Sequence, residues 1–181
     1  MRKNLLLFAI ILFFNGFSAH SQEVDGGKKF SYRSFSVSPL GVYFGKSSGL
    51  YVAGDISFDY GKHVFSLGVG SGIEGNLFGK SEEFSEFNFT YGQSFPLNEK
   101  LFADVYVGAG YFQYSSVGVI DDYTGRRGEI QESTIGFPIG AKFQYMLGQR
   151  FSMGLRVGAN VNAAKSIGTL GLVFQWNKKR N

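Results

Sequence analysis

The sequence predicts an all-β protein, an eight-stranded antiparallel up-and-down barrel, from three observations. Apolar and polar residues alternate with a period of two in eight runs along the 181-residue chain, as in strands with two unlike faces. The polar parity is mostly Gly, Ser, Thr and Asn, small residues that suit the interior of a narrow closed barrel. Tight turns follow the second, fourth and sixth runs, and two other connections are distinctly longer, which is typical of a meander with two unlike rims.

The first two runs differ in clarity. Within residues 30–44, Ser36 and Ser38 share one parity, but the alternation breaks after Pro39. Proline has no backbone N–H to donate to a ladder, so we expect a bulge or bend near Pro39. Residues 50–60 alternate throughout and form the clearest strand of the chain.

The remaining runs repeat this alternation, with Phe, Val, Leu and Ile on one parity. The expected strands cover approximately residues 30–44, 50–60, 64–74, 86–95, 101–111, 134–145, 151–162 and 169–176. Glycines on the polar parity of the third, fifth and seventh strands should leave room beside Tyr51, Tyr106 and Arg156. The longest loop is expected at about residues 115–132.

The N-terminal segment has the features of an export signal. Arg2 and Lys3 precede an apolar run of about ten residues, and small residues before position 22 fit a cleavage site. The run is too short for a membrane-spanning helix. We therefore expect a signal peptide over residues 1–21, a periplasmic leader over 22–29, a barrel over 30–176 and a basic tail over 177–181.

Alternation alone does not decide which face of the barrel is outside. A soluble barrel is apolar inside, and a membrane barrel is the reverse. The polar parity is mostly small and uncharged, and charged residues gather in the turns and loops, which favours a transmembrane barrel. Each strand is also long enough to cross a bilayer, which takes about 9–11 tilted residues.

Aromatic residues also gather where the strands meet the tight turns, as in a girdle at headgroup level. The expected periplasmic girdle consists of Tyr60, Phe65, Tyr91, Phe95, Tyr145, Phe151, Phe174 and Trp176. A second aromatic set lies toward the longer loops and consists of Tyr43, Phe44, Phe84, Phe87, Tyr111 and Phe112.

The last strand carries a resemblance to a known family. It combines Thr169, Gly171, Phe174 and Trp176, a polar residue and a glycine followed by two aromatics spaced by one. This strand is similar to the C-terminal assembly signal of small outer-membrane β-barrels of Gram-negative bacteria, and the chain resembles the OmpA and OmpX type over about residues 30–176. The resemblance implies an outer-membrane location and, as partners, the lipid bilayer and the outer-membrane assembly machinery.

Six charged residues fall on the inward parity of the expected barrel. They are Asp55, Asp59, Glu86, Asp104, Lys142 and Arg156. Isolated charges in a narrow lumen are costly, so we expect them to pair in a structural network. The alternative is a narrow pore with a slight cation preference.

Motifs for other chemistry are weak. Residues 70–75 match a dinucleotide glycine pattern as a string, but they lie in or beside an expected strand, whereas the motif needs a helix. His63 is the only histidine after the expected cleavage, and it lies in a turn. Asp121 and Asp122 in the expected long loop could contact a cation, but a solvated loop pair is the favoured interpretation. We expect no enzymatic activity, cofactor, metal or nucleic acid, and no cysteine is present.

The expected function follows from the location. We predict a structural, adhesive or surface-interaction role through the extracellular loops, with a surface partner that the sequence does not name. The first alternative is a narrow pore or small-ligand transport barrel. The second is a secreted soluble barrel that binds an apolar ligand.

Overall fold

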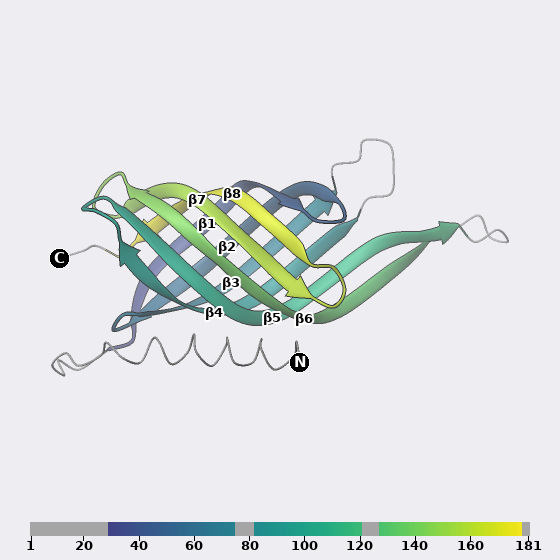
Figure 1. Ribbon diagram of the computed structural model, residues 1–181, viewed down its shortest axis with the longest axis horizontal. Helices are drawn as coiled ribbons and strands as arrows, with labels where there is room; N and C mark the ends of the chain where they lie inside the picture. Colours follow the sequence, from purple (N-terminus) through teal and green to yellow (C-terminus); the bar gives the residue numbers. More distant parts are fainter. Residues whose placement is uncertain (1–28, 75–81, 121–126, 179–181) are drawn as a thin grey trace, which may run out of the picture.

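The computed structural model describes residues 29–74, 82–120 and 127–178, which form a closed β-barrel (Figure 1). The expected signal peptide, nearly all of the leader and the last three residues of the tail lie outside the described residues. The strands are β1 Ser31–Phe44, β2 Ser48–Tyr60, β3 His63–Glu74, β4 Glu83–Pro96, β5 Leu101–Ile120, β6 Arg127–Met146, β7 Phe151–Asn162 and β8 Ile167–Asn177. In the described part of the chain, no helix has the length and apolar character needed to span a membrane.

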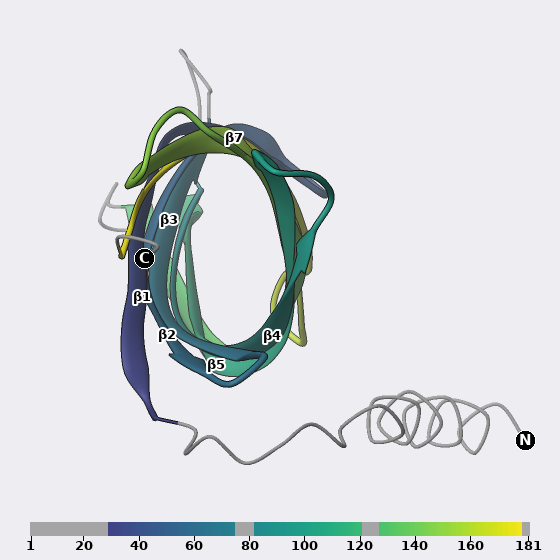
Figure 2. The same cartoon turned by 90° about the vertical axis from the view of Figure 1, so that its left-hand side faces the viewer.

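Each strand pairs antiparallel with the next, and β1 closes the sheet by pairing with β8 (Figure 2). Closure gives the backbone N–H and C=O groups of both end strands a partner, so the barrel wall has no open edge. The predicted fold class is confirmed: the protein is an eight-stranded antiparallel up-and-down barrel.

The two faces of the barrel wall have opposite chemistry. Outward side chains are apolar, as at Val69 and Leu155, which are 57% and 50% exposed. Inward side chains are mostly polar, as at Ser36, Asp55 and Gln144, which are buried. This arrangement is the inverse of a soluble barrel with an apolar interior. It favours a membrane barrel over the alternative of a soluble barrel that binds an apolar ligand.

Strand β1 contains the irregularity expected near Pro39. Its register shifts between Ser38 and Gly41 against β2, and between Val37 and Leu40 against β8. The shift changes which residues of the strand face inward, so that Tyr43 points into the lumen after Pro39.

A second shift in β1 was not expected. It lies between Tyr32 and Ser34 against β2. Arg33 occupies the extra position and reaches acidic side chains inside the barrel. The bulge therefore adds a cation to the lumen that simple alternation does not predict.

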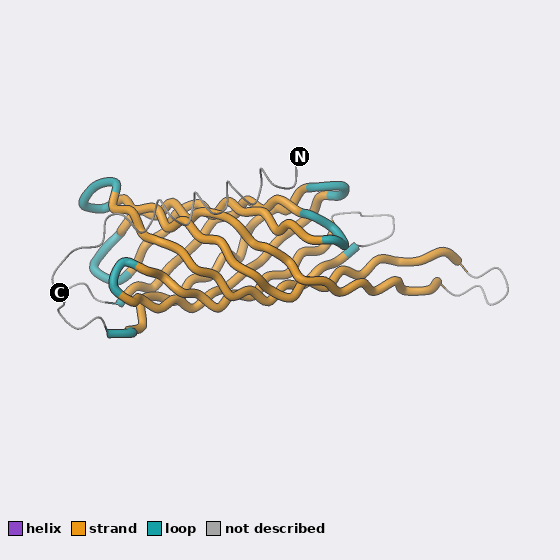
Figure 3. The backbone as a smooth tube through the Cα atoms, turned by 60° about the horizontal axis from the view of Figure 1, so that its bottom comes forward, coloured by secondary structure: helices purple, strands orange, loops and turns teal. Residues whose placement is uncertain are grey.

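Strands β5 and β6 are 20 residues each, whereas the other strands have 11 to 14. They continue as a hairpin beyond the barrel (Figures 1 and 3), with Ser115 opposite Gln131 and Val117 opposite Glu129. The loop expected over residues 115–132 is therefore wrong in its described part. Cross-strand pairing extends the sheet by roughly 20 Å past the end of β4.

Glycine shapes the tight turn between β2 and β3. Gly61 has a φ of 64°, which fits the first central position of a type II′ hairpin turn. This is the left-handed region that other residues rarely adopt.

Inward glycines make room for the large lumen side chains, as expected. A Cβ atom on Gly70 would lie 2.8 Å from the Tyr51 hydroxyl. A Cβ atom on Gly140 would lie 2.7 Å from the Tyr106 hydroxyl and 2.5 Å from the Val157 carbonyl oxygen. Glycine at these positions thus leaves the space that the two tyrosine side chains occupy in the narrow interior.

The contact at Gly140 gives a first test. Gly140→Ala should lower the free energy of unfolding by about 1–3 kcal/mol, because the added methyl overpacks against backbone. Gly148→Ala is the control, since a Cβ atom there meets nothing within 4 Å. Urea unfolding in detergent micelles measures both; equal stability of the two variants would contradict this packing.

Candidate functional site

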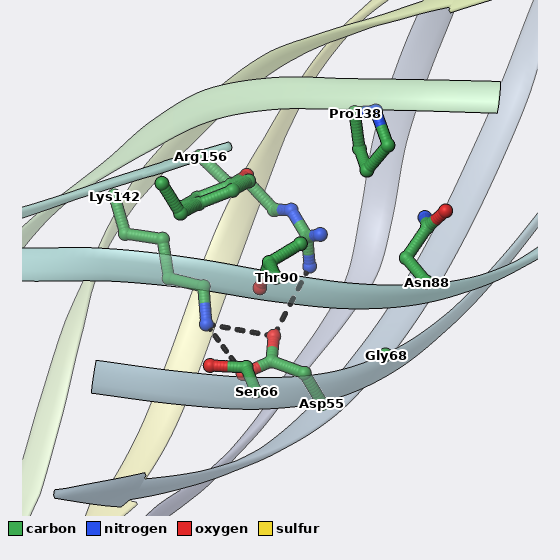
Figure 4. Close-up of a pocket in the computed structure, with 9 residues that line it drawn as sticks. Asp55, Ser66, Gly68, Asn88, Thr90, Pro138, Lys142 and Arg156 are labelled. Atoms are coloured by element: carbon green, nitrogen blue, oxygen red, sulfur yellow. Dashed lines mark hydrogen bonds and ion pairs between the residues drawn. The ribbon is translucent and has the colours of Figure 1, made fainter. Parts of the chain in front are cut away.

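The central part of the lumen contains a buried ion cluster (Figure 4). The Lys142 ammonium lies 2.6 and 2.7 Å from the two carboxylate oxygens of Asp55, and an Arg156 nitrogen lies 3.2 Å from one of them. The Ser36 hydroxyl donates a hydrogen bond of 2.7 Å to the same carboxylate. Asp55 thus ties β2 to strands β1, β6 and β7 across the barrel.

A second ion cluster lies nearer the tight turns and centres on Arg33. Its guanidinium nitrogens lie 3.0 Å from Asp59 and 2.7 Å from Asp104. It also donates to the Ser94 hydroxyl at 2.9 Å. The predicted lumen charges Asp59 and Asp104 therefore meet a cation that the sequence analysis missed.

Glu86 has neutral hydrogen-bonding partners in the described structure. The Tyr51 hydroxyl donates to one carboxylate oxygen at 2.9 Å, and the Asn160 amide donates to the other at 2.7 Å. The six predicted lumen charges therefore divide among separate clusters, and Glu86 is held without a direct cation contact among the described residues.

An aromatic plug fills the lumen toward the long-loop rim. It consists of Tyr43, Tyr51, Phe84, Phe112 and Ile167, all buried. The Phe84 ring lies 5.0 Å from the Tyr43 ring and 5.4 Å from the Phe112 ring, centroid to centroid. Such contacts stabilise beyond the burial of apolar area alone.

The plug divides the second aromatic set predicted from the sequence into inward and outward members. Three of its members, Tyr43, Phe84 and Phe112, point inward and belong to the plug. Phe44, Phe87 and Tyr111 are exposed on the outside. Parity shows the difference within β4, because Phe84 shares the parity of Glu86 and Phe87 does not.

A polar cluster lies above the plug at the long-loop rim. Lys165 forms an ion pair with Glu82, donates to the Ser47 hydroxyl at 2.6 Å and lies 4.6 Å from the centroid of the Tyr114 ring. Partial burial alone would raise the pKa of Glu82, but the hydrogen bonds from Lys165, Tyr114 and Ser47 and the Lys165 charge lower it to about 2. Because the partners come from connections as well as strands, sequence alternation did not predict this cluster.

Little open space remains between these layers. One cavity of about 30 Å³ lies beside the central ion cluster, and a second of about 20 Å³ lies next to it. Each has room for only one or two water molecules. Cavities of this size favour the structural network over the alternative of a narrow pore.

The predicted girdle residues lie on the outward parity at the tight-turn end. Ring contacts connect several of them, with centroids 5.5 Å apart for Phe65 and Tyr91 and 5.3 Å apart for Phe151 and Trp176. In β8, Thr169 points inward and Trp176 outward. Gly171 lies on the inward parity with Thr169, and Phe174 lies on the outward parity with Trp176.

The described residues contain no group of three or more His, Asp or Glu side chains able to hold a metal ion. His63 lies 2.6 Å from the Tyr91 hydroxyl and stacks on its ring. Gly70 and Gly72 lie within β3, so the glycine string begins in a strand. Asp121 and Asp122 lie outside the described residues.

The central ion cluster predicts a large stability effect. Lys142→Ala should lower the free energy of unfolding by about 3–5 kcal/mol, because it leaves the buried Asp55 carboxylate partly uncompensated. Lys46→Ala removes an exposed lysine and should change stability by less than about 0.5 kcal/mol. Urea titrations of both variants measure the difference, and a Lys142→Ala protein as stable as the Lys46→Ala control would rule out the cluster as a stabilising element.

The rim cluster predicts a pH dependence. The lowered pKa of Glu82 means that its contribution to stability is complete above the ordinary glutamate pKa and is lost as the pH falls toward about 2. The stability difference between the wild type and Glu82→Gln should therefore shrink over this range. Unfolding curves at a series of pH values measure it, with Glu83→Gln as the control for losing one exposed carboxylate. A difference that stays constant down to pH 2 would contradict the ion pair.

Comparisons with known proteins point to one fold. No protein-family model and no curated protein sequence matches the chain. The structural match with Neisserial surface protein A covers 82% of this chain and 97% of that protein's chain, with 8% identity and a TM-score of 0.62. The match with a major outer-membrane protein of Thermus thermophilus covers 81% of this chain and 99% of that protein's chain, with 14% identity and a TM-score of 0.59.

The attachment invasion locus protein Ail of Yersinia pestis, crystallised with the heparin analogue sucrose octasulfate, is also similar. It covers 83% of this chain and 98% of its own, with 11% identity and a TM-score of 0.52. These similarities extend around the whole barrel, and they agree with its strand number, closure and inverted polarity. The chain therefore has the eight-stranded transmembrane β-barrel fold of the small outer-membrane proteins of the OmpA and OmpX type.

Proposed function

We propose that the protein is an integral outer-membrane barrel with a structural or surface-interaction role and no enzymatic activity. The observation that carries this proposal is the combination of an apolar outer wall with a filled polar lumen. An apolar surface of this extent suits contact with lipid chains. The filled lumen leaves the loops and the β5–β6 hairpin as the parts available to partners.

The outer wall fits a bilayer in its details. Exposed Val, Leu, Ile and Phe side chains cover the middle of the strands, and the girdle residues lie at the tight-turn end. Aromatic residues favour the level of the lipid headgroups. We place the tight turns in the periplasm, with the strand β8 residues Thr169, Gly171, Phe174 and Trp176 as a signal for the assembly machinery after removal of the signal peptide.

The β5–β6 hairpin is the part best suited to contact other molecules. The ladder between β6 and β7 begins at Gly136 and Asn162. Residues 127–135 of β6 therefore have β5 as their only strand partner among the described strands. A strand at the margin of a sheet can accept a further strand along its outer side. The hairpin gives the surface-interaction role a physical basis.

Protease treatment of intact cells tests the location and the orientation together. The dipeptide Arg126–Arg127, whose second residue begins β6, should be cleaved by trypsin on intact cells that express the protein. An Arg126→Gln, Arg127→Gln double variant is the matched control and should lose this cleavage. Protection of the dipeptide on intact cells, with cleavage after lysis, would overturn the proposed orientation.

A further inference from the structure

The tight-turn rim carries a collar of exposed cations. Lys62 lies in the β2–β3 turn, Lys100 precedes β5, and Arg150 precedes β7. Lys29 and Lys178 flank the barrel at the start of β1 and the end of β8. Each point where the chain passes this rim therefore contributes at least one positive charge. Among the described turn residues there, Glu99 is the exposed acidic side chain.

The backbone near several of these cations is held by hydrogen bonds. The Asn98 side chain accepts bonds of 2.9 and 2.7 Å from the N–H groups of Lys100 and Leu101. The Lys178 N–H donates to the Arg33 carbonyl at 2.7 Å. Lys100 and Lys178 are thus attached to backbone that is fixed by hydrogen bonds.

The opposite rim has a different balance. Its acidic residues within the described ranges are Glu74, Glu82, Glu83, Glu129 and Glu132, whereas its cations there are Lys46, Arg127 and Lys165. Lys165 is paired with Glu82. The positive collar is therefore a property of one end of the barrel.

The collar lies just beyond the aromatic girdle. Tyr60 is two residues from Lys62, and Trp176 is two residues from Lys178. Aromatic rings at this level mark the depth of the headgroups, so the cations just beyond them meet the phosphate layer. Clustered Lys and Arg at this depth attract anionic lipids.

Resting on the proposed membrane insertion, we propose that the collar of Lys29, Lys62, Lys100, Arg150 and Lys178 binds the headgroups of anionic phospholipids. The collar thereby enriches these lipids around the tight-turn end of the barrel. The recognition is electrostatic: several cations around the circumference each approach a lipid phosphate, without a deep pocket for one molecule.

The chain contains its own reporter for this collar. Trp176 is the single tryptophan, it is 47% exposed, and it lies in the girdle beside Lys178. The whole barrel is reconstituted in phosphatidylcholine bilayers that contain phosphatidylglycerol, with brominated chains on one lipid or the other. Quenching of Trp176 fluorescence then measures the relative affinity of the two lipids at this rim.

Brominated phosphatidylglycerol should quench with a relative affinity at least about threefold above that of brominated phosphatidylcholine at low salt. The preference should fall toward one in about 0.5 M salt, which screens exposed charges. It should also fall toward one in a variant with Lys62→Gln, Lys100→Gln, Arg150→Gln and Lys178→Gln, whose folding is checked by heat-modifiability on gels.

A tryptophan at the other rim supplies the control. Phe87→Trp in a Trp176→Phe background places the reporter at an exposed outward position near Glu83, where no preference for phosphatidylglycerol is expected. Equal quenching of Trp176 by both lipids, or a preference that survives high salt, would overturn the collar as a lipid site. Absence of quenching by either lipid would instead overturn membrane insertion.

Discussion

Closure of the sheet between β1 and β8 determines most other properties of the molecule. It satisfies the backbone hydrogen bonds of the end strands, and with eight strands it leaves an interior only wide enough for side chains. Each inward position must then be small or must share a packed layer with its neighbours. The glycines beside Tyr51 and Tyr106 and the serines of β1 meet this requirement. The outward positions are free of it and are large and apolar.

The narrow interior also determines how the buried charges are neutralised. Charges inside such a space have few water molecules around them, so each needs protein partners. Asp55 obtains them from Lys142, Arg156 and Ser36, and Arg33 joins Asp59 to Asp104. The contacts of Asp55 with Lys142 and Arg156, and that of Arg33 with Asp104, connect strands that are not neighbours in the sheet. In a wider barrel such side chains would line a channel. In this narrow barrel they contact one another and stabilise the packed interior.

Strand number, parity and the bulge near Pro39 were predictable because they follow from local sequence. The lumen network was only partly predictable, since the inward charges follow from parity but their partners depend on the register of distant strands. Arg33 was missed because a bulge moves it off the expected parity. The β5–β6 hairpin was missed because its alternation is weak past Ser115 and its stability comes from cross-strand pairing. The inward position of Phe84 was predictable, because it shares the parity of Glu86.

The bulged strand β1 has a consequence for the order of folding. Every other ladder joins segments that follow one another in the chain, whereas the β1–β8 ladder joins Ser34 to Asn177. Bringing such distant residues together carries the largest loss of chain entropy of any pairing in the barrel. The same ladder is interrupted at Val37 and Leu40, so it offers fewer regular bonds to offset that loss. We therefore expect β1, the first strand of the barrel, to complete its pairing last, when β8 is in place.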